Sequence, residues 1–327
     1  MNNFLKRDEE LCLKGLGAFS IMIGHIAPAV IGFFFPGDLW VGIFFFYSGY
    51  GLMISYRKKE NYLSHFIRRK IINIYIPFAV AEISYLLSRA VIEHRNYSYK
   101  DLFFSVLGIK LSNSVLWYIV EIMVIYFIFW LIHYNRNRVQ NEWYWVILYA
   151  VFLVIGVVLD IGTWWYVSTS GFLIGILYDE ILKYIDFVIN HTVCKLLIVI
   201  FGVCSYCYMK YVIYMGKSVL GIKATYVFTF IEMIMVPIFI LTWMIILQKV
   251  SIKCKFLIFL GTISYDIYMI HMLTLLWISP LKITYCLKCI LAIIATICLS
   301  SLCYRVRKHF RRDIEKTEET IKCIVER

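Results

Sequence analysis

The chain has 327 residues, of which 61% are hydrophobic and only 17% are charged, and its mean hydropathy is +0.76. Soluble globular domains are nearer half apolar and a quarter charged, so this composition excludes an ordinary soluble domain and predicts an integral membrane protein. The formal net charge of +12 at pH 7 has two possible origins, a nucleic-acid partner or the orientation of the chain in a membrane.

Long apolar runs follow one another along the chain. Since a helix needs ~20 mainly apolar residues to cross the hydrocarbon core, we expect an all-α polytopic bundle of about ten membrane-spanning helices. They are expected at 10–32, 38–56, 71–92, 114–134, 143–161, 163–182, 195–215, 224–248, 256–278 and 283–304. The run 163–182 fits least well, because it is short and carries the polar sequence STSG.

The distribution of Lys and Arg predicts the orientation of this bundle. With a cytoplasmic N-terminus, 23 of the 33 basic residues fall in loops and ends on the cytoplasmic side and six in loops on the other side. Such a bias is the positive-inside rule, so both termini are expected in the cytoplasm and no nucleic-acid partner is expected. Residues 1–304 form one membrane domain in this interpretation. Residues 305–327 form a charged cytoplasmic tail that could lie on anionic membrane lipid.

The ten Cys do not indicate a disulfide scaffold, because most lie in or beside apolar runs, where Cys acts as a small hydrophobe. Cys204 and Cys207 have no second Cys or His pair at zinc spacing. We therefore expect no metal and no bound cofactor.

Ionisable residues inside expected spans are costly, and they usually face the bundle interior or a water-filled path. Lys14 precedes His25 by eleven residues, so both lie on nearly the same helix face, with Lys14 ~16 Å nearer the cytoplasm. Two alternatives stay open: His25 is a hydrogen-bonded packing residue, and Lys14 pairs with Glu121 or another buried carboxylate. Glu82 and Arg89, seven residues apart on one face, are expected to contact other helices.

A second histidine, His271, is expected at a similar depth. His25 and His271 each lie about fifteen residues, or ~20 Å, from the cytoplasmic end of their spans, so they could line one cavity displaced toward the outer leaflet. Ser264, Tyr268 and His271 share one side of the span 256–278, where the alternative is that they tie helices together.

Five ordered motifs resemble those of the acyltransferase 3 family, whose members are membrane O-acyltransferases of surface polysaccharides, lipopolysaccharide, other glycoconjugates and some antibiotics. The resemblance covers about residues 11–275. The motifs are LKGLGAFSIMIGHI, DLWVGIFFFYSGYGLMISYRKK, FIRRKIINIYIPF, LWYIVEIMVIYF and SYDIYMIH.

Individual positions match the family's motifs, with two departures. Lys14 and His25 match the family's basic residue followed, after ten positions, by the His thought to be needed for acyl transfer. The family's Phe-rich signature around Ser-Gly is matched by Phe45, Phe46, Ser48, Gly49 and Tyr50. In the basic motif Asn73 replaces a typical Arg and Ile76 a typical Pro. Gly49 and Gly51 would allow close helix approach around the cavity.

The resemblance implies acetyl-CoA as a cytoplasmic acyl donor. Arg68, Arg69 and Lys70 would then hold its phosphates, since Arg binds phosphate bidentately, and Lys14 would extend the positive path inward. The alternative for the basic cluster is that it only sets topology.

His25 would act as general base on an acceptor hydroxyl, with an acyl-His intermediate as the alternative. The candidates to line the cavity or to stabilise the oxyanion are Ser48, Glu121, Ser264, Tyr268 and His271. The expected acceptor is a surface polysaccharide, such as capsule, or a lipid-linked sugar, and the expected location is the plasma membrane.

Two other function classes compete with acyl transfer. A transporter or flippase of a lipid-linked sugar would also have many spans and polar residues at mid-depth, although no inverted repeat is visible. A structural subunit of a polysaccharide machine would tolerate loss of His25. A serine hydrolase of the soluble type is not indicated, because the chain has no G-x-S-x-G.

Overall fold

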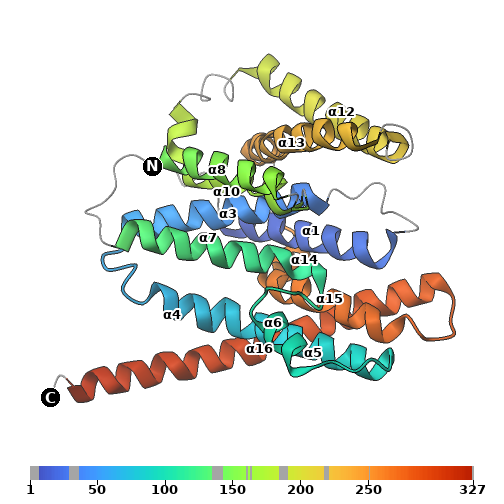
Figure 1. The fold of residues 1–327 in the computed structure, drawn as a ribbon. Coiled ribbons are helices and arrows are strands. Elements are labelled where there is room, and N and C mark those ends of the chain that lie inside the picture. Colours follow the sequence, from blue (N-terminus) through green and yellow to red (C-terminus); the bar gives the residue numbers. More distant parts are fainter. Residues whose placement is uncertain are drawn as a thin grey trace. The chain divides into compact units, whose positions relative to one another are not determined.

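The computed structural model describes residues 7–28, 37–134, 143–159, 161–162, 164–183, 191–216, 221–249 and 251–325. Every regular element in these ranges is a helix (Figure 1), which agrees with the predicted all-α class. The chain forms two compact units, each built from two stretches of sequence. The first unit comprises Met1–Tyr62 and His133–Thr262, and the second comprises Leu63–Ile132 and Ile263–Arg327.

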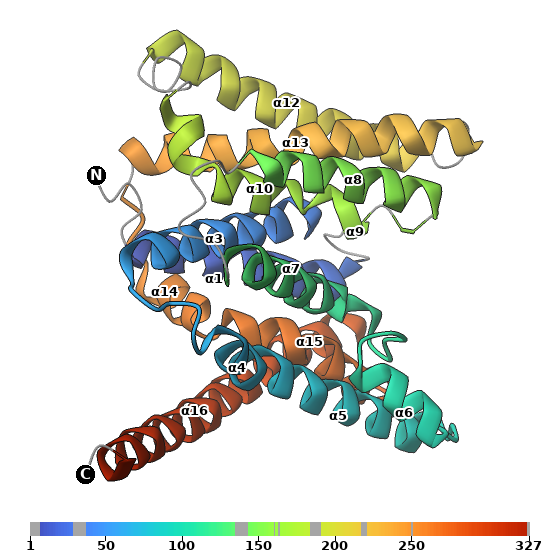
Figure 2. The same ribbon diagram turned by 60° about the vertical axis from the view of Figure 1, so that its left-hand side comes forward.

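The first unit contains eight of the described helices. They are α1 (Arg7–Ile26), α3 (Gly37–Lys58), α8 (Tyr144–Val158), α9 (Trp164–Val167), α10 (Ser170–Ile176), α12 (Thr192–Gly216), α13 (Gly221–Lys249) and α14 (Lys255–Thr262). Helix α1 packs against both α14 and α3, α3 packs against α10, and α12 lies along α13 (Figure 2).

Glycines let α3 and α10 approach until their backbones touch. Gly171 and Gly175 form a small-xxx-small pair on α10, and a Cβ at either position would overlap the backbone of α3 at Gly42 or Phe46. A Cβ at Gly49 would in turn overlap the carbonyl oxygen of Phe172. The predicted close approach at Gly49 is therefore confirmed. The same expectation for Gly51 is wrong, because no atom of the described residues lies within 4 Å of a Cβ there.

The second unit begins with a long helical segment that contains a π turn near its start. Its elements are α4 (Phe66–Lys70), the π-helix η1 (Ile71–Tyr75), α5 (Ile76–Ile92), α6 (Tyr99–Val106), the 3-10 turn η2 (Ser114–Leu116), α7 (Trp117–Tyr134), which ends just past the unit's boundary, α15 (Ser264–Ile278) and α16 (Tyr285–Val325). The π turn directly precedes Pro77, which has no N–H to donate to the carbonyl of Asn73 and would clash with it in a regular α-helix. Widening the turn at η1 accommodates the proline within one continuous segment.

In their described residues, the apolar segments that were expected to span the membrane are mainly helical. Among the described residues, four helices are long and apolar enough to cross a bilayer, Gly37–Lys58, Phe66–Ile92, Ser114–Tyr134 and Tyr285–Arg312. Helices α14 and α15, which are separated by a break, would make a fifth if they form one span. The count of ten and the cytoplasmic position of both termini stay predictions.

The weakest expected span is a broken helix. Residues 163–182 contain α9 and α10, which are interrupted at Ser168 and Thr169. The Ser168 hydroxyl donates to the carbonyl of Asp38 at 2.9 Å, and the Thr169 hydroxyl donates to the carbonyl of Trp165 at 3.1 Å. The polar residues that weakened the sequence signal therefore hydrogen-bond to backbone carbonyls beside the break.

The last helix continues without a break past residue 305, where the tail was expected to begin. Helix α16 has 41 residues and runs from Tyr285 to Val325. Its first part packs against α15. The expected tail is thus the continuation of the last apolar helix.

Gly49→Ala should lower the thermal unfolding midpoint of the detergent-purified protein, because the added methyl group would overlap the backbone of α10. Overpacking of this kind costs about 1–3 kcal/mol. Gly51→Ala is the matched control, and it should leave the midpoint unchanged or raise it slightly, because Ala favours a helix over Gly by ~1 kcal/mol. Equal midpoints for the two variants would contradict the close approach of α3 and α10.

Candidate active site

The structure places the predicted site residues in both units. His25, Lys14 and Ser48 belong to the first unit. The second unit carries the other seven, Arg68, Arg69, Lys70, Glu121, Ser264, Tyr268 and His271. Each group is described within its own unit.

Helix α1 brings His25 to an accessible position. The helix begins with Asp8, Glu9 and Glu10 in its first turn, where carboxylates interact favourably with the helix dipole. It ends at Ile26, two residues before Pro28, which disfavours helix in the residue before it. His25 therefore lies in the last helical turn, and its side chain is exposed. An accessible imidazole at a helix end can meet a substrate.

Lys14 has an acidic partner in its own helix. Its ammonium lies 2.5 Å from the Oε1 atom of Glu10, one turn earlier, and 5.2 Å from the ring centroid of Tyr47 on α3. Lys14 thus has a carboxylate partner, but this partner is the half-buried Glu10 and not the buried carboxylate, Glu121 or another, that the alternative named. The spacing of four residues was visible in the sequence and is the usual spacing for such a pair. Ser48 lies half-buried on α3, next to the close contact at Gly49.

The three cations of the basic motif do not form one cluster. Arg68 and Arg69 are exposed on α4. The Lys70 ammonium lies 3.6 Å from the ring centroid of Tyr126 and 5.1 Å from that of Phe66, so it makes cation–π contacts inside the unit. Arg68 and Arg69 are thus at the surface of the unit, whereas the side chain of Lys70 packs against aromatic rings.

Asn73, where the family typically has Arg, has a structural role. Its Nδ2 atom donates to the carbonyl of Arg69 at 2.8 Å. This bond lies across the junction between α4 and the π turn, so the departure from the family's pattern coincides with the irregular helix at this point.

The motif SYDIYMIH forms the start of α15, and its polar residues connect helices. The Tyr265 hydroxyl donates to the carbonyl of Ile74 at 2.8 Å, and the Tyr268 hydroxyl donates to the carbonyl of Val115. Ser264 is buried in the same turn. For Tyr268, the structure therefore supports the alternative that these residues tie helices together, because its hydroxyl donates to a backbone carbonyl.

His271 is completely buried, and one of its nitrogens is assigned by geometry. Its Nδ1 atom lies 3.1 Å from the carbonyl oxygen of Ile267. Because a carbonyl can only accept, Nδ1 carries the proton, and in the neutral ring Nε2 is then the basic nitrogen. Glu121 on α7 is also buried, with 4% of its surface exposed.

Two polar contacts of the second unit were not predicted. Asp266 is buried and its Oδ2 atom lies 2.6 Å from Nη2 of Arg307, a residue that the sequence had placed in a solvated tail. The Arg307 guanidinium also lies 5.1 Å from the ring centroid of Tyr265. Asp266 lies inside the expected span 256–278, but Arg307 lies beyond the last apolar run, and no pattern in the sequence connects the two.

Glu82 and Arg89 differ in what they contact. Glu82 is fully buried and accepts hydrogen bonds from the Ser105 hydroxyl, from the Ser112 N–H at 2.8 Å and from the Asn113 N–H at 3.3 Å. It therefore joins α5 to the segment before α7, as expected. Arg89 instead pairs with Glu93 at 2.9 Å, at the end of its own helix, and this pair holds the pKa of Glu93 below its usual value.

Comparison with known protein families gives one match. A model of the acyltransferase 3 family, described as an acyltransferase domain, matches residues 12–305. No curated protein and no solved structure matches the chain. Among the described residues, no three His, Cys, Asp or Glu side chains are grouped so that they could hold a metal ion.

Arg307→Ala should destabilise the protein, because it leaves the carboxylate of Asp266 buried without its ion-pair partner. Breaking a fully buried pair costs ~3–5 kcal/mol. Since about a quarter of the Arg307 side chain is exposed, we expect a loss near the low end, seen as a lower thermal unfolding midpoint.

Arg305→Ala is the matched control for Arg307→Ala. Arg305 is an exposed cation on the same helix, and its substitution should change stability by no more than ~0.5 kcal/mol. The double variant Arg307→Ala with Asp266→Asn should recover part of the loss. A midpoint for Arg307→Ala equal to that of Arg305→Ala would contradict the ion pair.

Proposed function

Because the chain belongs to the acyltransferase 3 family, it is a membrane acyltransferase, and we propose that it transfers an acetyl group from cytoplasmic acetyl-CoA to a sugar hydroxyl. The proposed acceptor is a surface polysaccharide such as capsule, or a lipid-linked sugar, and the proposed location is the plasma membrane. The observation that carries the proposal is an accessible histidine, His25, at the end of a helix that lies within the matched domain.

The proposed chemistry gives His25 the role of general base. Its imidazole takes the proton of the acceptor hydroxyl as the hydroxyl oxygen attacks the thioester carbonyl. The carbon–sulfur bond then breaks, the coenzyme leaves as a thiolate, and the proton on the imidazole returns to that sulfur. An acyl-His intermediate is a second route to the same products.

The donor's phosphates are proposed to bind at Arg68 and Arg69. Both guanidinium groups are exposed on α4, and Arg can form two parallel hydrogen bonds to one phosphate. Lys70 is excluded from this direct role in the proposal, because its ammonium already lies over the ring of Tyr126. Lys14 is likewise expected to attract phosphate less, since the carboxylate of Glu10 offsets its positive charge.

Two alternative functions differ from this proposal in what they require of His25. A flippase of a lipid-linked sugar would move the acceptor without consuming acetyl-CoA. A structural subunit would need neither the donor nor the imidazole. Acetylation of a surface glycan that depends on His25 therefore separates acyl transfer from both.

His25→Ala should abolish O-acetylation of the cell-surface glycan. The measurement is the base-labile acetyl signal in the NMR spectrum of surface glycans from a deletion strain that carries wild type or the variant at equal expression. His94→Asn is the matched control: His94 is an exposed histidine with a φ of 51°, a backbone conformation that Asn tolerates, and this variant should retain the signal. Full acetylation by His25→Ala would rule out the assigned base.

Arg68→Ala and Arg69→Ala should each weaken acetyl-CoA binding by the purified protein, because each removes a charge-assisted hydrogen bond worth ~1.5–3 kcal/mol. That range corresponds to a rise in KM of roughly 10- to 150-fold. Lys58→Ala, which removes an exposed cation at the end of α3, is the control and should leave KM unchanged. An equal effect of Lys58→Ala would mean that Arg68 and Arg69 contribute only a general positive charge.

A further inference from the structure

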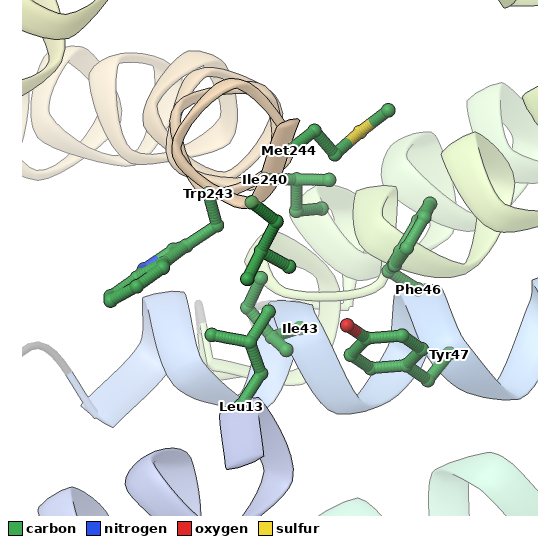
Figure 3. Close-up of a pocket in the computed structure, with 8 residues that line it drawn as sticks. Leu13, Ile43, Phe46, Tyr47, Ile240, Trp243 and Met244 are labelled. Carbon is green, nitrogen blue, oxygen red and sulfur yellow. The ribbon is translucent and has the colours of Figure 1, made fainter. Parts of the chain in front are cut away.

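The cavity in the interior of the first unit is too small for an organic ligand. It lies between α1, α3 and α13 (Figure 3) and is lined mainly by apolar side chains. Its volume is about 10 Å³, which is room for about one water molecule. The more informative feature is a surface of the second unit, on the short helix α6.

Helix α6 exposes an apolar face. Tyr99, Phe103 and the C-cap residue Leu107 are spaced four residues apart, so they form one stripe along the helix. Their side chains are 93%, 60% and 45% exposed. Phe104 lies beside this stripe and Ile109 follows the end of the helix, and both are also exposed. Soluble proteins rarely expose contiguous apolar surface of this kind, and where it occurs it marks a contact with a membrane or with another protein.

The one buried residue of α6 is a serine. The hydroxyl of Ser105 donates to the carboxylate of Glu82 on α5 and lies 2.8 Å from the hydroxyl of Ser112. Glu82 also accepts from the N–H groups of Ser112 and Asn113, so its carboxylate joins both α6 and the segment after it to α5. A surface helix of a soluble protein packs its apolar face inward and turns its polar face to water. Helix α6 is inverted, with its serine inside and its aromatic side chains outside.

Both ends of α6 are fixed by hydrogen bonds. At the N-terminus, Ser98 and Asp101 form a capping box. At the C-terminus, the N–H of Gly108 donates to the carbonyl of Ser105 and the N–H of Ile109 to that of Phe104, each at 2.9 Å. Gly108 has a φ of 74°, which glycine adopts without strain. The exposed stripe therefore belongs to a well-defined helix and not to an irregular loop.

The neighbouring helix indicates what covers this stripe. Helix α6 packs against α5 (Figure 2), and α5 belongs to the candidate membrane span Phe66–Ile92. Val80, Leu87 and Val91 on α5 are exposed and are spaced seven and four residues apart, so they form one face of the helix. In a membrane this apolar face meets lipid. The exposed stripe of α6 therefore lies next to the end of a helix that lipid covers.

The flanking residues favour a membrane surface over a protein partner. Lys100 lies beside the stripe and Lys110 follows it, and both are exposed. Lysine can extend its alkyl stem along an apolar surface and keep its ammonium among polar groups, and tyrosine is enriched at the level of the lipid headgroups. The centre of a protein interface is instead depleted of lysine. Aromatic side chains with lysines beside them are typical of a helix that lies in the plane of the membrane interface.

We propose that α6 lies in the plane of the membrane surface, with Tyr99, Phe103 and Leu107 against the acyl chains and the two lysines among phospholipid headgroups. In the predicted orientation, residues 93–113 connect two expected spans on the side opposite to the cytoplasm, so the leaflet is the outer one. Helix α6 then holds the connection between α5 and α7 at the membrane surface. The proposal does not depend on the reaction that the protein catalyses.

The test replaces Phe103 by the photoreactive analogue p-benzoylphenylalanine in the full-length protein. The protein is irradiated in nanodiscs of a single phospholipid and, in parallel, in cell membranes. Mass spectrometry should find phospholipid attached at position 103 in both samples. Leu87 on α5, replaced in the same way, is the positive control. Glu60, an exposed residue that follows α3, is the negative control and should acquire no lipid.

Phe103→Asp gives a second, independent measurement. In nanodiscs, hydrogen exchange of the α6 amides should become ~10-fold faster or more, because the helix opens more readily once its apolar contact with lipid is lost. Lys100→Gln is the matched control on the same helix, and it should leave the exchange rate unchanged, because it keeps a polar group among the headgroups.

Each other outcome would overturn the proposal. If Leu87 acquires lipid and Phe103 does not, α6 lies in water. If position 103 is attached to a protein in cell membranes, the stripe is a protein interface. If Leu87 itself acquires no lipid, the exposed face of α5 does not meet lipid, and the inference for α6 fails with it. Unchanged exchange in Phe103→Asp would likewise show that the side chain has no contact with lipid.

Discussion

Backbone polar groups inside a membrane need hydrogen-bond partners within the protein, and the second unit depends on this constraint. Lipid tolerates irregular backbone only where its N–H and carbonyl groups are satisfied internally. Two short irregular segments, η1 and η2, precede the long apolar helices α5 and α7. The Tyr265 hydroxyl donates to the carbonyl of Ile74 in η1, and the Tyr268 hydroxyl donates to the carbonyl of Val115 in η2. One turn of α15 therefore supports both segments.

The ion pair of Asp266 fits the same arrangement. Asp266 lies between the two tyrosines in sequence and pairs with Arg307 on α16, whose guanidinium also lies over the Tyr265 ring. A buried carboxylate contributes little net stability when paired and is strongly destabilising when its partner is lost. The pair therefore fixes the position of α16 against α15 more than it adds free energy. Arg307 lies beyond the apolar run, and about three quarters of its side chain is nevertheless buried.

The sequence predicted the helices well and their polar contacts poorly, for physical reasons. Apolar runs of about 20 residues identify helices because the bilayer sets their length, and the polar STSG stretch marked the break between α9 and α10. The Glu10–Lys14 pair follows from a spacing of four residues. The Asp266–Arg307 pair joins positions 41 residues apart, and no local rule selects one partner among the eight basic residues of the tail. The difference between Gly49 and Gly51 depends on which helix face meets α10, which composition does not encode.

The buried tyrosine hydroxyls differ in whether they already have a hydrogen-bond partner. Tyr268 was a candidate to stabilise an oxyanion, but its proton is directed at the carbonyl of Val115. An oxyanion hole requires donors that are held in place and still available to the developing charge, so Tyr268 would have to break a bond to backbone that the bilayer cannot replace. Tyr47 is in the opposite condition, since it is held by packing and its hydroxyl is unsatisfied among the described residues. Among the described residues, the hydroxyl of Tyr268 thus serves the architecture, whereas the hydroxyl of Tyr47 still has a proton to donate.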